Sequence, residues 1–66
     1  MEITVNGKLL RVVEKCTISQ LLVDLDLPNT RIAVEVNRTV IARSTHDTFV
    51  LSAHDRVEII HAVGGG

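Results

Sequence analysis

The sequence predicts an α+β fold in which a mixed sheet of four to five strands wraps around one helix. Three features predict it: an Asn-Gly turn between two strand-like segments, one short amphipathic helix after them, and a strongly apolar final strand. A helix between strands must cover one face of the sheet to bury its leucines. The chain has 66 residues, of which 45% are apolar, so we expect a single domain with an aliphatic core.

The first two strands are predicted to form a hairpin. Asn6-Gly7 separates two segments that read as strands, and this pair favours a two-residue turn because both positions then need a positive φ. Such a turn places Ile3 opposite Leu10. Four apolar residues then share the face that we expect to point inward: Ile3, Val5, Leu10 and Val12.

A helix is predicted over residues 17–25. Thr17 and Gln20 have the spacing of a capping box, in which each side chain satisfies an open backbone N–H of the other residue. Pro28 disfavours helix at the preceding residue and is expected to end the element. The apolar stripe of this helix consists of Ile18, Leu21, Leu22 and Leu25.

The rest of the chain reads as three more strands with their connections. The last strand is apolar on both alternations, so we place it in the middle of the sheet, parallel to the first strand. The segments are a strand over 31–36 with Ile32, Val34 and Val36 on one face, a tight turn at Asn37-Arg38, a short strand over 39–42, a polar loop over 43–48, a helical turn or strand fragment over 49–51, a turn over 52–55 and a final strand over 56–63.

The sequence finishes with Gly64, Gly65 and Gly66. Glycine has no Cβ, so these residues are expected to form a flexible tail (64–66) on a folded domain (1–63). Three extended residues reach about 10 Å, enough to carry a carboxylate through a slot too narrow for side chains.

The whole chain resembles the bacterial sulfur carriers of thiamine biosynthesis, a ubiquitin-like β-grasp family with a terminal Gly-Gly. The likeness rests on the Ile3-to-Gly7 opening, the Thr17-to-Leu25 helix, the Val34-to-Asn37 strand and turn, and the segment 56–66. One departure is visible: these proteins often carry a glycine in the turn before the last strand, and here that turn is Ala53-His54-Asp55.

The resemblance implies a chemistry for the tail. A ubiquitin-activating-type enzyme would use ATP and Mg²⁺ to adenylate Gly66, and a persulfide-bearing desulfurase or rhodanese-like protein would supply sulfur. The resulting thiocarboxylate would serve thiazole synthase. Gly64 and Gly65 would enter the partner's active site, and the expected docking residues are Ile60, Ala62 and Val63. The chain itself would be no enzyme, with no catalytic residue, metal or cofactor of its own.

Composition excludes other classes of protein. The net charge is −1 and the charges are scattered, which argues against nucleic-acid binding. No apolar stretch is long enough for a membrane helix, and no secretory signal is visible, so we expect a cytoplasmic protein. Cys16 is the single cysteine, which excludes an internal disulfide framework.

Other residues of chemical interest have plainer interpretations. Cys16 is expected to be a small hydrophobic residue that packs near the helix start, although a redox or persulfide role stays open. The three histidines lack zinc-ligand spacing and are expected at the surface, with one of them at the rim of the last strand. A hydrolase triad is excluded because its candidates fall within one turn: Ser52, His54 and Asp55. The histidines are His46, His54 and His61.

Two alternative functions stay open. The small subunit of molybdopterin synthase shares the fold and the terminal Gly-Gly, although it is usually longer. A β-grasp module for binding RNA or protein is the alternative of a different class, and the scattered charge and the terminal glycines argue against it.

Overall fold

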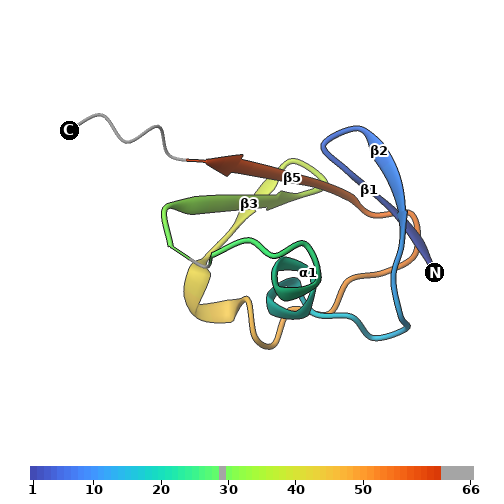
Figure 1. Ribbon diagram of the computed structural model, residues 1–66, viewed down its shortest axis with the longest axis horizontal. Helices are drawn as coiled ribbons and strands as arrows, with labels where there is room; N and C mark the ends of the chain where they lie inside the picture. The colour runs from blue at the N-terminus through green and yellow to red at the C-terminus, as the bar shows by residue number, and fades with distance from the viewer. Residues whose placement is uncertain (29, 62–66) are drawn as a thin grey trace.

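A computed structural model describes residues 1–28 and 30–61. Figure 1 shows the sheet on one side and the helix α1 beneath it. Among the described residues, five strands form one sheet in the order β2-β1-β5-β3-β4, which confirms the predicted mixed sheet around one helix. The elements are β1 (Glu2–Val5), β2 (Lys8–Arg11), α1 (Ile18–Asp24), β3 (Ile32–Val36), β4 (Thr39–Ile41), the 3₁₀ turn η1 (Arg43–Thr45) and β5 (Arg56–His61).

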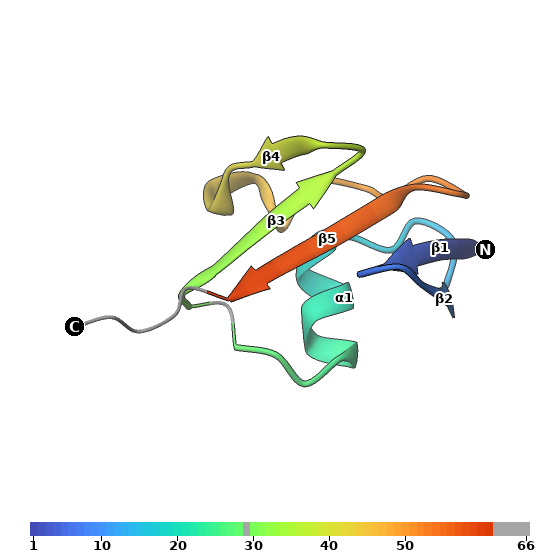
Figure 2. The ribbon, with the colours of Figure 1, turned by 90° about the horizontal axis from the view of Figure 1, so that it is seen from above.

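Strand β5 occupies the centre of the sheet, as predicted. It runs parallel to β1 and antiparallel to β3, and Figure 2 shows it lying between them. Only one of its two alternations is buried: Val57 and Ile59 face the helix, whereas Ile60 is 47% exposed. The apolar character of both alternations therefore located the strand correctly, but one apolar residue remains on the open face.

Asn6 connects the first hairpin to β5. The hairpin has the predicted register, with Ile3 opposite Leu10. Asn6 has a φ of +50° in the turn. Its backbone N–H donates to the Val57 carbonyl at 2.9 Å. Its side-chain oxygen accepts from the Ile59 N–H at 2.8 Å, and its amide nitrogen donates to the Ile59 carbonyl at 3.4 Å. Backbone pairing of β1 with β5 covers two residue pairs, so this amide extends a short contact.

The start of α1 confirms half of the predicted capping box. The Thr17 hydroxyl accepts from the Gln20 N–H at 3.1 Å. The reciprocal bond is absent, because the Gln20 side chain instead donates to Asp24, one turn further along, at 2.9 Å. The prediction of a reciprocal box was therefore wrong, because the Gln20 side chain forms a hydrogen bond with the Asp24 carboxylate four residues ahead on the helix surface.

The helix ends earlier than Pro28 requires. Asp26 has a φ of +58°, the left-handed conformation that closes many helices. The Leu27 N–H donates to the Leu22 carbonyl and the Asp26 N–H to the Val23 carbonyl, each at 2.9 Å. This is the Schellman pattern, so the backbone has already turned away before the proline.

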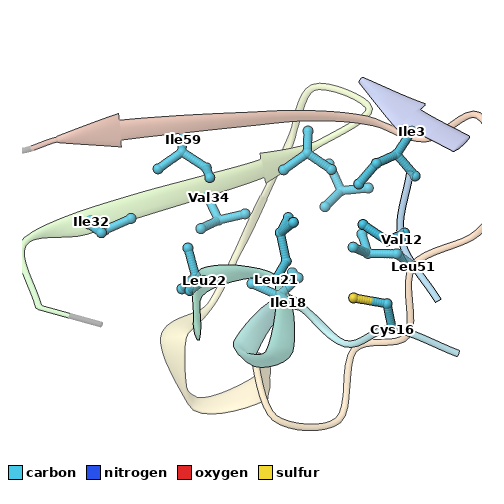
Figure 3. Close-up of a cluster of buried hydrophobic side chains, with 12 residues drawn as sticks. Ile3, Val12, Cys16, Ile18, Leu21, Leu22, Ile32, Val34, Leu51 and Ile59 are labelled. Carbon is cyan, nitrogen blue, oxygen red and sulfur yellow. The ribbon is translucent and has the colours of Figure 1, made fainter. Parts of the chain in front are cut away.

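The core is aliphatic and lies between α1 and the sheet (Figure 3). Of the two conformations predicted for residues 49–51, the structure shows the strand fragment, because Val50 forms an isolated bridge with Thr17. Leu51 of this segment is buried in the core, and its N–H donates to the Cys16 carbonyl at 2.8 Å. The buried apolar residues are Ile3, Val12, Cys16, Ile18, Leu21, Leu22, Ile32, Val34, Val36, Leu51, Val57 and Ile59.

Cys16 is part of this core. It is 2% exposed, and its thiol donates to the Thr17 carbonyl at 3.4 Å. Burial raises the pKa of the Cys16 thiol, and the negative charge of Asp24 raises it further. The thiol is therefore held in its protonated form, which supports the interpretation of Cys16 as a packing residue.

We expect Asn6→Gly to lower the free energy of unfolding by about 1–2 kcal/mol, because the two bonds to Ile59 are lost although glycine suits the positive φ. Lys15→Gly is the matched control, since Lys15 also has a positive φ, of 64°. The control should raise stability slightly. Urea unfolding of both variants is the measurement, and equal stabilisation by the two would contradict a role for the amide.

The stability of the protein should fall in alkaline solution in a way that depends on Cys16. The unfolded thiol ionises near the ordinary value of 9.0, whereas the folded thiol has a raised pKa and keeps its proton. This stabilisation is therefore complete below the unfolded pKa and is lost as the pH rises through the folded one. Urea unfolding over this pH range should show a smaller alkaline loss for Cys16→Ala than for the wild type. Identical pH slopes would contradict the assignment.

Candidate functional site

Most of the predicted site lies outside the described residues. The sulfur-carrying residue Gly66, the tail residues Gly64 and Gly65, and two predicted docking residues belong to that part; the two are Ala62 and Val63. The third docking residue, Ile60, is described and is half exposed on the sheet face opposite α1. Its predicted exposure is confirmed. The candidate site is therefore built from what surrounds the end of β5.

The end of β5 is fixed by its neighbour and by the core. Strand β3 begins where β5 ends, pairing Ile32 with His61 and Ala33 with Ile60 (Figure 2). On the face of the sheet that α1 covers, Ile32 of β3 is 7% exposed and Ile59 of β5 is 6% exposed. These two buried side chains hold the ends of both strands against the core. The segment that leads toward residue 66 therefore starts from a held position.

A shallow hollow of about 410 Å³ lies beside this strand end. We call it the β5-end hollow; it is lined by Arg31, Ile32, Ala33, Arg43 and Ile60. Its two arginines come from different segments, one just before β3 and one in η1. Within the described part of the chain, neither guanidinium has a carboxylate within 4.0 Å. The hollow thus combines an apolar floor with two cations that no described acidic side chain neutralises.

The backbone of Arg31, one of the residues that line the hollow, has an unfavourable conformation. Arg31 has a φ of +58°, in the left-handed region that non-glycine residues rarely adopt. Six other described non-glycine residues also have a positive φ, so this conformation does not by itself mark Arg31 as a functional residue. The sequence did not single out Arg31 or Arg43, because nothing in the local pattern shows that two arginines twelve positions apart share one hollow.

The middle of the same sheet face carries two carboxylates, and exposed Arg56 lies two residues from one of them on β5. Glu35 of β3 lies directly opposite Glu58 of β5. Glu35 lies two residues from Ala33 on β3, and Glu58 lies two residues from Ile60 on β5. Side chains two residues apart on a strand point to the same face, so both carboxylates project from the face that bears the hollow. Like charges at such a position cost about 0.2–1 kcal/mol relative to an uncharged pair. The described ion pairs, Met1–Glu14 and Arg11–Glu2, involve neither carboxylate.

The histidines divide between surface and core. His54 and His61 are exposed, as predicted. The prediction for His46 was wrong: it is 1% exposed, and its Nε2 lies 3.1 Å from the Ile41 carbonyl. Its Nδ1 has no hydrogen-bond partner among the described residues. The polar residues around it suggested a surface loop, but η1 folds back toward α1, where the Ser19 N–H donates to the His46 carbonyl at 3.1 Å.

No second reactive centre is assembled elsewhere in residues 1–28 and 30–61. No group of three potential metal ligands occurs among them. The Asp55 carboxylate accepts from the Ser52 N–H at 2.8 Å and from the Asn37 amide at 3.0 Å, so it organises its turn. The helix that is described is too short to span a bilayer.

Comparison with known proteins places the chain in a family. The model of the ThiS family matches residues 3–66. A protein of Magnetococcus marinus named thiazole synthase is 35% identical over 66 residues, covering all of this chain but 20% of that protein. The uncharacterized protein ycf40 of Porphyra purpurea is 39% identical over 67 residues, covering all of this chain and 93% of that protein. The chain thus spans about a fifth of the first relative and most of the second.

Solved structures agree with the fold. The crystal structure of the thiamine biosynthesis protein ThiS from Geobacter metallireducens has a TM-score of 0.86 and 33% identity, with complete coverage of both chains. The solution structure of a thiamine biosynthesis protein from the same organism has a TM-score of 0.81 and 33% identity, covering all of this chain and 88% of that one. The β-grasp arrangement is therefore confirmed, and the chain belongs to the ThiS family, the thiamine-biosynthesis carriers that its sequence resembles.

Proposed function

We propose that this protein is the sulfur carrier for thiazole formation in thiamine biosynthesis, and that Gly66 holds the sulfur as a thiocarboxylate. Membership of the ThiS family carries the proposal, because the match extends over residues 3–66 and includes the three glycines. The solved relatives are thiamine biosynthesis proteins, which favours this pathway over molybdopterin synthesis.

The proposed chemistry begins with activation of the carboxylate. A terminal carboxyl group has a reference pKa of about 3.3–3.7, so near neutral pH it is an anion that resists nucleophiles. A ubiquitin-activating-type partner with ATP and Mg²⁺ would let this carboxylate attack the α-phosphate, forming an acyl adenylate and releasing pyrophosphate. AMP is then the leaving group when sulfur attacks the acyl carbon.

Sulfur transfer follows from a persulfide on a desulfurase or rhodanese-like donor. The terminal sulfur bonds to the acyl carbon of Gly66 and AMP leaves. A thiol then attacks the sulfur–sulfur bond, which leaves the thiocarboxylate on the carrier and a disulfide between the thiol and the donor. In this scheme Cys16 plays no part, because its thiol is 2% exposed and its pKa is raised by burial.

The protein would act as a co-substrate, with the catalytic groups supplied by its partners. Its own contribution is to hold the end of β5 between β3 and the core and to present the glycines beyond it. Gly64 and Gly65 suit a narrow active-site slot because they have no side chain to exclude. Thiazole synthase is the proposed acceptor. The thiazole synthase of Magnetococcus marinus supports this, because about a fifth of its length is similar to this chain.

We expect Gly66→Ala to reduce adenylation about a hundredfold or more, because a Cβ displaces the carboxylate from the α-phosphate and small misplacements are costly. The measurement is pyrophosphate exchange with the activating enzyme, and thermal unfolding should be unchanged. Lys8→Ala, an exposed change on β2, is the control and should exchange at the wild-type rate. Exchange by Gly66→Ala at the wild-type rate would refute the proposed role of Gly66.

A further inference from the structure

We propose that Asn6 is a positioning residue for the reaction at Gly66, because its side-chain amide fixes the direction in which β5 leaves the sheet toward the tail. This inference rests on the proposed function, since it concerns how the carrier presents its carboxylate to the activating enzyme. It gives a role in the reaction to a side chain that lies in the turn between β1 and β2, outside the tail.

The Asn6 amide continues the β1–β5 ladder after β1 has ended. Strand β1 ends at Val5, and its backbone register with β5 ends at the pair Val5–Val57. Strand β5 continues to His61, past the end of β1 (Figure 2). The Ile59 N–H donates to the Asn6 side-chain oxygen at 2.8 Å, and the Ile59 carbonyl accepts from the Asn6 side-chain nitrogen at 3.4 Å. A primary amide has the donor and the acceptor of a peptide group, so it takes the place of one further residue of β1.

Among the described residues, this contact is the last hydrogen bond between the first hairpin and β5 before the tail. On its other edge β5 pairs with β3 as far as His61, so these two strands hold each other. Together they are joined to β1 by the pairs at Arg56 and Val57 and by the amide at Ile59. Without the amide, the last hydrogen bond to the hairpin lies at Val57, and the end of β5 can change its direction relative to the rest of the sheet.

The direction of β5 at Ile59 matters because the reacting group is far from it. Seven residues follow Ile59, and fully extended they span at most about 23–25 Å. Over such a length, a small change of direction displaces the carboxylate by several ångströms. An enzyme that accepts the tail in one orientation then finds a smaller fraction of carriers in that orientation, which lowers the apparent affinity by the same factor. Once the tail is bound, the enzyme sets the position of the carboxylate, so turnover of the complex is unaffected.

Asn37 makes the same kind of contact at the opposite end of β5. It also lies in a tight turn, and its φ is +51° where that of Asn6 is +50°. Its side-chain oxygen accepts from the Arg56 N–H at 2.9 Å, and its side-chain nitrogen donates to the Asp55 carboxylate at 3.0 Å. Replacing either asparagine therefore removes two amide hydrogen bonds, but only Asn6 is bonded at the end that leads to the tail. A purely structural role predicts equal consequences for the two replacements, whereas a positioning role predicts different ones.

The test is ATP–pyrophosphate exchange by the activating enzyme at a series of carrier concentrations. Asn6→Gly keeps a residue that suits the positive φ, and it should raise the KM for the carrier at least about fivefold while kcat stays within about twofold of the wild-type value. The matched control is Asn37→Gly, whose KM should stay within about twofold of the wild type because the fraction of correctly presented tails is unchanged. Thermal unfolding of both variants gives the folded fraction at the assay temperature, by which the carrier concentrations are corrected.

Amide hydrogen exchange shows whether each replacement has released its end of the strand. The Ile59 N–H should exchange faster in Asn6→Gly, and the Arg56 N–H should exchange faster in Asn37→Gly. An unchanged KM in Asn6→Gly, an equal rise of KM in both variants, or a rise without faster hydrogen exchange at Ile59 would overturn the positioning role. If the wild type is adenylated normally, those results leave the proposed function intact. A wild type that is not adenylated refutes the proposed function, and this inference with it.

Discussion

The pairing of β5 with both of its neighbours determines where this protein can present its final residues. On one side, five residue pairs join β5 to β3. On the other, two parallel pairs join it to β1, and the Asn6 amide adds two hydrogen bonds to Ile59. Each such bond contributes about 0.5–1.5 kcal/mol net, so the amide is a substantial part of the β1–β5 contact. A residue required by the hairpin turn thus also secures the strand that leads to the tail.

The small aliphatic core limits what the body can do. A domain of about this length buries only about 60% of its unfolded surface, and here that interior is filled by branched side chains on one face of the sheet. His46 and Cys16 are both enclosed, so two residues with reactive side chains serve packing and local hydrogen bonding. The open face of the sheet carries charged side chains: Glu35 opposite Glu58, and the arginines Arg31 and Arg43 at the β5-end hollow. The proposed sulfur chemistry accordingly uses the chain end and neither His46 nor Cys16.

Local sequence patterns predicted most of the fold. The Asn-Gly turn set the register of the first hairpin, the spacing of Ile18, Leu21 and Leu22 identified the buried side of α1, and the apolar last strand was placed correctly beside β1. Features that depend on contacts between segments far apart in the sequence were not predicted. His46 is buried because η1 folds against α1, and Arg31 and Arg43 line one hollow because the start of β3 lies beside η1. The reciprocal capping box failed because Asp24 competes for Gln20.

Tandem mass spectrometry of the carrier, after incubation with its activating enzyme, ATP, a persulfide donor and a thiol, tests the proposed role of Gly66. The mass should increase by the difference between sulfur and oxygen, and the increase should be found in fragments that contain Gly66. An added sulfur atom located on Cys16, an unchanged mass, or a mature polypeptide that continues beyond Gly66 would contradict that role.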